Sequence, residues 1–285
     1  MRVVSYNIQY GTGKDGQVDL ERIAGDIGDA DIIALQEVER YFSTTGNIDQ
    51  PAGLAALFPT HFWVYGAGVD LHAGTDEDKS RRRQFGNMLL SRWPVLSSRN
   101  HLLPKTGYVD YLALQRSALE AVIETPLGGL RVYSVHLGHV GGPERRRQIT
   151  ALMEIVNEAP ADGGVVSGRQ ASKHWTTDAA LPPMPSPAML LGDFNLAPET
   201  AEYELLVGKR NDKYQRLTTH RHLVDAWVTA GDDVDAGDTC FDHFGRSQRI
   251  DYAFVTPDLA DRVQAISVDT EAQGSDHQPL ILQLE

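Results

Sequence analysis

Eight polar residues at the ends of apolar runs have side chains suited to binding a metal ion and cleaving a phosphate ester. Each apolar run predicts a β-strand, and a strand end holds its side chains on a rigid support. Carboxylates and amides supply oxygen ligands for a hard divalent cation, and an imidazole can transfer protons near neutral pH. Strand ends from distant parts of the chain can bring such groups to one point. The eight residues are Asn7, Glu37, His136, Asp193, Asn195, Asp251, Asp276 and His277.

Two of these strand ends offer oxygen ligands in a specific arrangement. Glu37 follows four apolar residues and Gln36; taken alone, it is typical of a solvated glutamate at the end of a strand. Asp193 and Asn195 lie two residues apart, so in an extended segment their side chains point the same way. The carboxylate can then orient a water molecule while the amide donates to a phosphate oxygen. The structural alternative for this pair is an Asx turn after a strand.

The two histidines suit proton transfer, with alternatives that the residues alone leave open. His277 has the unperturbed pKa expected of a general base and needs a carboxylate to orient it. Asp251 and the adjacent Asp276 are both candidates for that partner. His136 could donate to a phosphate oxygen or to the leaving group. Taken alone, it is typical of a core histidine bonded to the backbone.

Alternating strands and helices must position these residues, and the pattern predicts an α/β fold. The turn at 126–129 predicts a hairpin, and Asp19 predicts a helix N-cap. Expected helices are 19–29, 52–58, 143–158 and 199–207, with a short segment at 222–230. Expected strands are 2–8, 31–36, 62–66, 85–91, 95–102, 117–124, 130–137, 188–192, 250–256, 263–269 and 279–284.

Two segments are predicted to be irregular. Residues 70–84 are polar and contain three consecutive arginines, Arg81, Arg82 and Arg83. These could bind an anionic headgroup or a phosphate, or form an ordinary solvated loop. Residues 159–187 are rich in proline and glycine and contain the cluster Arg169, Lys173, His174 and Trp175. A loop this long is either a surface insertion or a substrate-facing element.

Composition limits the function classes. The 285 residues are compatible with one large domain spanning 1–285. The net charge of −13 disfavours a dedicated nucleic-acid binder without excluding a nuclease. A single cysteine, no signal peptide pattern and no apolar run near ~18 residues lead us to expect a cytoplasmic protein.

The order of the motifs resembles the endonuclease/exonuclease/phosphatase superfamily, which includes deoxyribonuclease I, bacterial sphingomyelinases and inositol-polyphosphate 5-phosphatases. The resemblance covers essentially the whole chain and implies a four-layer α/β sandwich, with two mixed β-sheets face to face and helices outside. The motifs are Ser5-Tyr6-Asn7-Ile8, Gln36-Glu37, Gly86-Asn87, Ser134-Val135-His136-Leu137, Gly192-Asp193-Phe194-Asn195, Arg249-Ile250-Asp251-Tyr252 and Ser275-Asp276-His277.

The resemblance also implies a metal site. Glu37 is similar to the principal metal-ligating glutamate of the family, and Asn7 to the asparagine beside that metal. Asp276 is similar to an aspartate near a possible second metal site. The implied cofactor is a divalent cation, Mg²⁺ first, with Mn²⁺ or Ca²⁺ as alternatives.

The remaining residues match catalytic positions of the family. Asp193 resembles the aspartate that orients the attacking water, and Asn195 the asparagine that stabilises the phosphoryl oxygens. His277 resembles the general base and Asp251 its orienting partner. His136 resembles a histidine that contacts phosphate or assists the leaving group.

Three further residues have weaker signals. Arg116 stands where family members often carry an arginine, and we expect it first to pair with a site carboxylate and second to contact phosphate. His139 and His243 either enlarge the site or lie at its rim.

We therefore predict a metal-dependent phosphoester hydrolase, acting as a phosphodiesterase on a small or lipid-derived phosphate ester. The alternative within the same class is an endo- or exonuclease. A non-catalytic binding protein is a third class, and the intact set of chemical side chains argues against it.

Overall fold

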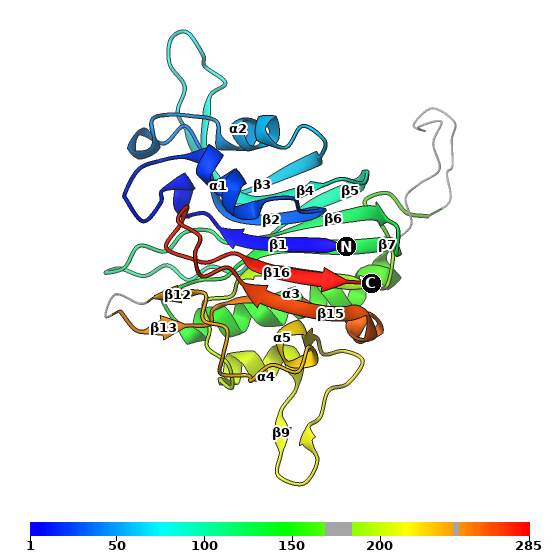
Figure 1. Cartoon of the computed structure of the whole chain (residues 1–285). Helices are drawn as coiled ribbons and strands as arrows, with labels where there is room; N and C mark the ends of the chain where they lie inside the picture. The colour runs from blue at the N-terminus through cyan, green and yellow to red at the C-terminus, as the bar shows by residue number, and fades with distance from the viewer. Residues whose placement is uncertain (169–183, 242–244) are drawn as a thin grey trace.

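Two six-stranded β-sheets lie face to face in the computed structural model, which describes residues 1–168, 184–241 and 245–285 (Figure 1). The first sheet has the order β15 (Val263–Val268), β16 (Leu280–Leu284), β1 (Arg2–Asn7), β2 (Ile32–Arg40), β4 (Arg82–Ser91), β3 (Phe62–His72). The second has the order β11 (Val224–Asp225), β14 (Asp251–Val255), β8 (Ala188–Asp193), β7 (Gly128–His136), β6 (Ser117–Thr125), β5 (Val95–Leu102). The cluster Arg169, Lys173, His174 and Trp175, and also His243, lie outside the described residues.

Helices cover the outer faces of both sheets, which gives four layers (Figure 1). Alternating side chains on each strand serve two cores: Val3 of β1 faces the second sheet, and Val4 faces the helices. The helices are α1 (Leu20–Ile27) and α2 (Gln50–Leu57) on the first sheet, and α3 (Gly142–Asp162) and α4 (Ala201–Val207) on the second. The short helix α5 (Ala226–Thr229) contacts β14 and β15. The predicted four-layer sandwich is confirmed.

Parallel strand pairs bring the site residues to one end of the sandwich. β1 runs parallel to β2, and β7 runs parallel to β8, where His136 pairs with Asp193. The carboxyl ends of parallel strands meet at the same edge of a sheet. In Figure 1 this end lies at the left, opposite the two chain termini.

Buried polar side chains join the two sheets near this end. The Asn87 amide on β4 donates to the carbonyls of Ser117 and Ser134 in the opposite sheet, at 2.9 and 3.0 Å. Gln36 of β2 donates to the Ser134 hydroxyl at 2.9 Å, which itself donates to the Leu35 carbonyl. Buried hydrogen-bonded groups of this kind fix one relative placement of two elements. Asn87 of the Gly86-Asn87 motif thus fixes the position of one sheet relative to the other behind the site.

The prediction for residues 70–84 was wrong at both ends of the segment. β3 continues to His72 and β4 begins at Arg82, so the strands extend into the segment and leave 73–81 between them. Asp70 pairs with Gln84 in the ladder, and its carboxylate accepts from the Arg82 guanidinium at 2.8 Å. Cross-strand pairing of this kind overrides a polar composition.

Most other elements agree with the predictions within two residues, but β2 continues to Arg40, so Glu37 lies inside the strand and not at its end. The hairpin at 126–129 is confirmed, and the Asp19 carboxylate accepts from the Arg22 amide as the N-cap of α1. Helix α3 runs to Asp162, so the segment predicted as irregular from 159 begins later. The remaining elements are 3₁₀ turns η1 (Gln9–Gly11), η2 (Ser43–Thr45) and η4 (Pro257–Arg262), and the short pairs β9 (Arg210–Asn211) with β10 (Gln215–Arg216) and β12 (Cys240–Phe241) with β13 (Ser247–Gln248).

The described ends of the 159–187 segment lie away from the strand ends that carry the candidate site. In the β7–β8 ladder, Ala188 pairs with Arg131, while the site residues His136 and Asp193 pair five positions further along. The buried Arg131 guanidinium donates a hydrogen bond to the Pro185 carbonyl at 2.8 Å. Within the described residues, no helix is long and apolar enough to cross a membrane.

Candidate active site

A β-bulge directs Glu37 into the site. The register of β2 against β4 shifts between Leu35 and Val38, and Glu37 has a φ of 59°. A bulge inserts an extra residue into one strand and re-aims its side chain. The Glu37 carboxylate lies 3.8 Å from Nε2 of His136. Burial raises the pKa of Glu37, and the positive charge of Arg116 is the strongest opposing influence.

Asp193 is the hydrogen-bonding centre of the site. Its Oδ2 accepts from the Asn7 amide at 3.1 Å and lies 3.3 Å from Nε2 of His136 and 3.9 Å from Nε2 of His277. Its Oδ1 accepts from the Asn195 backbone N–H at 2.8 Å. Burial raises the pKa of Asp193 to about 7. The described contacts around this carboxylate supply no lysine or arginine within ion-pair distance.

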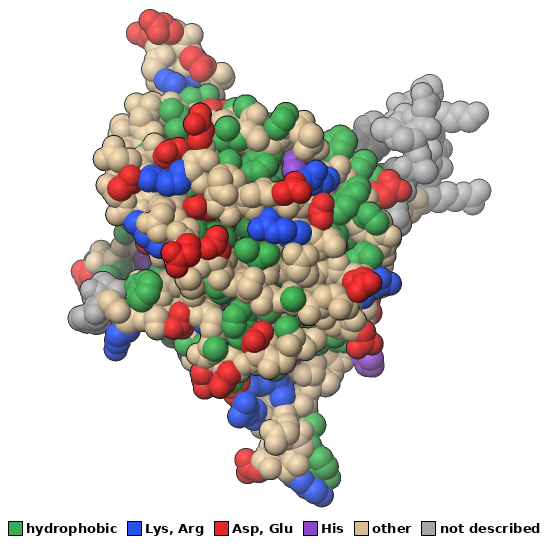
Figure 2. Space-filling view, in the orientation of Figure 1, with side chains coloured by type: hydrophobic (Ala, Val, Ile, Leu, Met, Phe, Trp, Pro, Cys, Tyr) green, Lys and Arg blue, Asp and Glu red, His purple; other side chains and the backbone are tan. Residues whose placement is uncertain are grey.

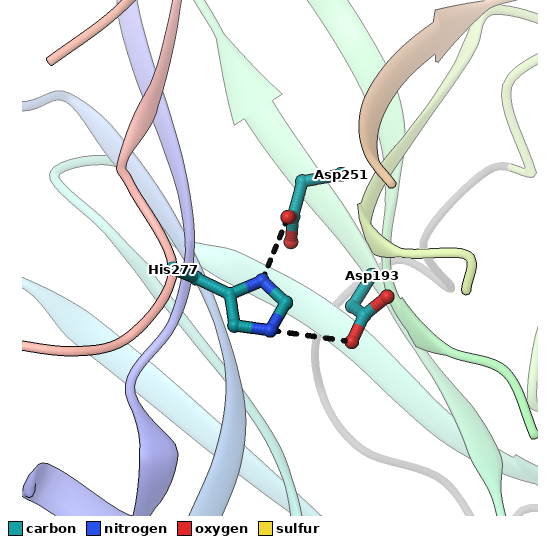
Figure 3. A group of neighbouring side chains, drawn as sticks. All are labelled: Asp193, Asp251 and His277. Carbon is teal, nitrogen blue, oxygen red and sulfur yellow. Dashed lines mark hydrogen bonds and ion pairs between the residues drawn. The ribbon is translucent and has the colours of Figure 1, made fainter. Parts of the chain in front are cut away.

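His277 is held by Asp251 (Figure 3). The Nδ1 atom of His277 lies 2.8 Å from Oδ2 of Asp251, and that oxygen also accepts from the Thr239 hydroxyl at 2.6 Å. Burial opposes a charged imidazole, but Asp251 outweighs it and raises the pKa of His277 well above its usual range. Of the two candidate partners, the structure places Asp251 against His277. Asp276 is exposed and accepts from the Gln9 side chain at 2.8 Å.

His136 lies on the other side of Asp193 in a different protonation state. Its Nδ1 lies 3.0 Å from Nη1 of Arg116. A guanidinium has only donors, so Nδ1 must accept, and the ring proton is on Nε2. Burial, followed by the charge of Arg116, lowers the pKa of His136 well below its usual range. His136 is therefore a neutral imidazole that presents an N–H to the two site carboxylates.

Arg116 contacts histidines in place of the carboxylate that the sequence led us to expect. Its second guanidinium nitrogen, Nη2, lies 3.1 Å from Nδ1 of His139. Among the described residues Arg116 forms no ion pair with a carboxylate, and each of its two terminal nitrogens contacts an imidazole. His139 also lines the cavity, so it enlarges the site, which is the first of the two interpretations given for this residue.

Asn7 and Asn195 both lie in the site, with part of each amide engaged. The Asn7 carbonyl accepts from the Gln9 backbone N–H at 3.1 Å, and its amide nitrogen faces Asp193. Asn195 has a φ of 51°, and its amide donates to the Leu137 carbonyl at 3.1 Å. These bonds hold the amides in place beside the carboxylates.

These groups surround a cavity of about 290 Å³. Its lining combines polar side chains with three apolar ones, Phe85, Leu112 and Leu114. The Phe85 ring lies between Tyr10 and His136, with centroid separations of 6.2 and 6.3 Å. The remaining lining residues are Tyr10, Glu37, Arg116, His136, His139, Asp193, Asn195 and His277.

Two sets of residues could hold a cation. Glu37 lines the cavity with Asn7 beside it, and Asp276 lies outside the lining at the exposed rim. A second group consists of Asp193, Asp251 and His277, whose ligand atoms lie within 4.8 Å of one another. In that group, Nδ1 of His277 is already bonded to Asp251, which suits proton transfer.

The sequence model of the Endonuclease/Exonuclease/phosphatase family matches residues 4–277. The chain belongs to this family. Family members hydrolyse phosphoesters, generally with a divalent metal ion, and the chain is accordingly a phosphoester hydrolase. No curated protein sequence matches the chain significantly.

Solved structures of this family share the fold at low sequence identity. The endonuclease/exonuclease/phosphatase from Beutenbergia cavernae is 24% identical with a TM-score of 0.66, over 100% of this chain and 71% of that one. A mannosyl-6-phosphatase from Bacteroides thetaiotaomicron is 18% identical with a TM-score of 0.64, over 100% and 99% of the two chains. Truncated TDP2 from Caenorhabditis elegans is 18% identical with a TM-score of 0.61, over 99% and 96%. At these identities the likeness establishes the fold.

Sequence reasoning missed part of the site of this family member. Thr239 is buried against Asp251 but lies outside any strand-end motif. Leu112 and Leu114 belong to the connection between β5 and β6, for which the pattern predicted no element. The run Leu112-Ala113-Leu114 is an apolar stretch with no strand or helix partner, and this was the available signal.

Proposed function

We propose that this chain is a metal-dependent phosphodiesterase that acts on a small or lipid-derived phosphate ester. The observation that carries the proposal is the cavity lined by both polar and apolar side chains. Phe85, Leu112 and Leu114 would contact an apolar part of the substrate while the polar lining residues contact the phosphate. Among the lining residues, Arg116 is the one arginine, and there is no lysine. A duplex would need a longer basic surface. On the face in Figure 2, acidic and basic side chains of the described residues are interspersed.

The charge of the cavity favours a diester over a monoester. Glu37 and Asp193 lie in its wall, and the single guanidinium of Arg116 is engaged by two imidazoles. A phosphodiester carries one negative charge near neutral pH, and a monoester carries nearly two. Like charges repel strongly in a partly buried site. The diester therefore meets the smaller electrostatic penalty.

Glu37 is the residue we assign to hold a divalent cation, with Asn7 and Asp276 nearby. The donor atoms are oxygens, which suits Mg²⁺ first and Mn²⁺ or Ca²⁺ as alternatives. The fit rests on the largely buried Glu37 carboxylate, whose nearest ion-pair partner among the described residues is the neutral His136 at 3.8 Å. When bound, the cation would neutralise charge on the phosphate and lower the pKa of a coordinated water.

His277, Asp251 and Asp193 are assigned to the proton of the attacking water. Asp251 holds Nδ1 of His277 and so directs Nε2 toward Asp193. A raised imidazole pKa makes the deprotonated ring a stronger base. Asp193 would orient the water, because its Oδ2 lies between the two histidines.

His136 and Asn195 are assigned to the phosphate side. Arg116 fixes His136 as the tautomer with a proton on Nε2, so this ring donates without having to ionise. Such a donor can stabilise a phosphoryl oxygen or assist the departing alkoxide. The Asn195 side-chain amide donates one N–H to the Leu137 carbonyl, and its second N–H would donate to a phosphoryl oxygen in the cavity that Asn195 lines.

A substrate panel tests this proposal. Bis-p-nitrophenyl phosphate, p-nitrophenyl phosphate, glycerophosphocholine and supercoiled plasmid DNA would each be assayed with Mg²⁺, Mn²⁺, Ca²⁺ and EDTA. We expect metal-dependent turnover of the two small diesters, with kcat/KM at least about tenfold above that of the monoester. A higher kcat/KM for plasmid cleavage would establish the nuclease alternative. Preference for the monoester would refute the diester assignment.

A further inference from the structure

Strand alternation separates the three consecutive arginines of the 70–84 segment. The Arg82 guanidinium pairs with the Asp70 carboxylate at 2.8 Å. Arg83 is the next residue on β4, so its side chain points to the opposite face, and Arg81 directly precedes the strand. Arg81 lies over the Tyr41 ring, with its guanidinium carbon 4.2 Å from the centroid. Arg83 lies over the Phe42 ring at 5.6 Å and donates to the Tyr41 carbonyl.

In the described part of the chain no carboxylate lies within ion-pair distance of Arg81 or Arg83, and the pKa of Asp78 is lowered by its hydrogen bond with Ser80 and, to a smaller extent, by the charge of Arg81. Among the described residues neither forms an ion pair, although Asp76, Glu77 and Asp78 lie at the tip of the same hairpin. The Asp78 carboxylate is bonded to the Ser80 hydroxyl and backbone N–H. Guanidiniums stacked on aromatic rings keep their planar donor edges free for an anion.

This stacked pair lies beside the cavity on the same face of the first sheet. Arg83 and Phe85 are two residues apart on β4, so their side chains leave the same face with Cα atoms roughly 7 Å apart. Phe85 is part of the cavity wall. Glu39, which pairs with Phe85 in the ladder, is buried and accepts from the Thr45 hydroxyl, so it is turned away from solvent. In Figure 1 the β3–β4 hairpin projects beyond the sheets at the top of the molecule.

We propose that Arg81 and Arg83, stacked on Tyr41 and Phe42, bind a second phosphate group of the substrate. This inference rests on the proposed function, because it extends the same site outward along β4. The planar guanidinium edges match the oxygens of a phosphate bidentately. The substrate would then carry its scissile diester in the cavity and a further phosphate beyond Phe85. The local cations also offset the unfavourable net charge of the chain at this point.

Competition between matched sugar phosphates tests the assignment. Glucose 6-phosphate and glucose 1,6-bisphosphate differ by one phosphate group, and each would compete with bis-p-nitrophenyl phosphate in the presence of Mg²⁺. In the wild type we expect the bisphosphate to inhibit at least about tenfold more strongly. In the double variant Arg81→Gln/Arg83→Gln this ratio should fall to about twofold or less. The matched control is Arg82→Gln, which removes one charge from the same run and should keep the wild-type ratio.

The outcomes separate this inference from the proposed function. An equal inhibition ratio in the double variant and in Arg82→Gln would overturn the second-phosphate site. If the wild type hydrolyses no diester with any metal, the proposed function fails, and calorimetric titration of the same two sugar phosphates still decides the inference. A single-stranded oligonucleotide is the third probe. If the double variant weakens its binding but leaves the sugar-phosphate ratio unchanged, the patch serves nucleic acid and the small-substrate proposal is refuted.

Discussion

Two buried carboxylates in the second sheet have opposite electrostatic surroundings. Glu120 on β6 accepts from Nε and Nη2 of Arg99 at 2.8 and 3.1 Å. It also accepts from the Tyr133 hydroxyl at 2.8 Å and lies 3.2 Å from Nε2 of His101. Burial alone would raise its pKa, but these partners lower the pKa of Glu120 to about 2. Asp193 on β8 accepts from the Asn7 amide and the Asn195 backbone N–H, with no arginine or lysine in ion-pair distance among its described contacts, and burial raises its pKa to about 7.

The difference shows which cluster serves stability and which is left open for chemistry. The Glu120 cluster contains its own counter-charge and needs no further ligand. The Asp193 cluster, with Glu37 nearby, contains carboxylates whose pKa values burial raises against the opposing charges of Arg116 and His277. Strongly perturbed carboxylates in a cavity are typical of functional sites. A divalent cation bound at this cluster would stabilise the charged form of these carboxylates.

The largest expected effect comes from replacing the histidine of each cluster by alanine. His277→Ala should lower kcat for bis-p-nitrophenyl phosphate by about 10²–10⁴-fold, because it removes the general base. His101→Ala, the matched control at Glu120, should leave kcat within about twofold of the wild type. Steady-state kinetics with saturating Mg²⁺ measure both. Equal losses in the two variants would show that the distinction between the clusters is false.

The second prediction exchanges a carboxylate for its neutral isostere in the site. Glu37→Gln should raise the Mg²⁺ concentration for half-maximal activity at least about tenfold, because a charged ligand is lost. Its thermal stability in EDTA should equal or exceed that of the wild type, because folding disfavours the charged form of Glu37. Metal titrations and melting curves test the two parts. An unchanged metal requirement would remove Glu37 from the metal site.

The third prediction replaces the carboxylate of the other cluster, Glu120, by its neutral isostere glutamine. Glu120→Gln should lower the free energy of unfolding by on the order of 2 kcal/mol near pH 7 and leave the metal requirement unchanged. The folded pKa of Glu120, about 2, lies below the ordinary value of 4.5. The carboxylate therefore stabilises the fold above about pH 4.5, and this contribution is lost as the pH falls toward 2.

Denaturant unfolding of the wild type and Glu120→Gln across this pH range measures that difference. The gap between the two proteins should be constant from pH 6 to 8 and shrink below about pH 4.5. Using the variant as the reference cancels the titration of the other carboxylates. A gap that is independent of pH would mean that Glu120 is stabilised by packing, with no net contribution from its charge.

Strand-end positions made much of the site predictable from the sequence. His136 and Asp193 end neighbouring parallel strands, so their convergence follows from the fold. Asp251 faces Asp193 across an antiparallel pair, which places it near the same point. The pattern of apolar runs was sufficient because parallel strands end at one edge of a sheet.

Contacts that depend on tertiary packing could not be predicted from the sequence. The partners of Arg116 are the last residue of β7, His136, and His139 in the segment after it, and a sequence pattern does not distinguish an imidazole partner from a carboxylate. The choice between Asp251 and Asp276 depended on which way two adjacent side chains turn. The bulge at Glu37 reverses the simple alternation of β2, and local periodicity contains no signal for it.

The smallest expected effect concerns Thr239, which acts on His277 through Asp251. The Thr239 hydroxyl donates to Asp251 Oδ2 at 2.6 Å and accepts from the Asp251 backbone N–H at 3.1 Å. Thr239→Val keeps the shape but removes the donor that positions the carboxylate. We expect kcat to fall roughly tenfold with KM nearly unchanged, because the substrate does not contact this residue.

Thr239→Ser is the matched control, since it restores the hydroxyl and removes only a methyl group. It should recover most of the turnover, and both variants should melt within a few degrees of the wild type. Equal losses of kcat in the Val and Ser variants would mean that the methyl group matters and the hydrogen bond does not. The orientation of His277 would then depend on Asp251 alone, and the site cluster would be as self-sufficient as the cluster around Glu120.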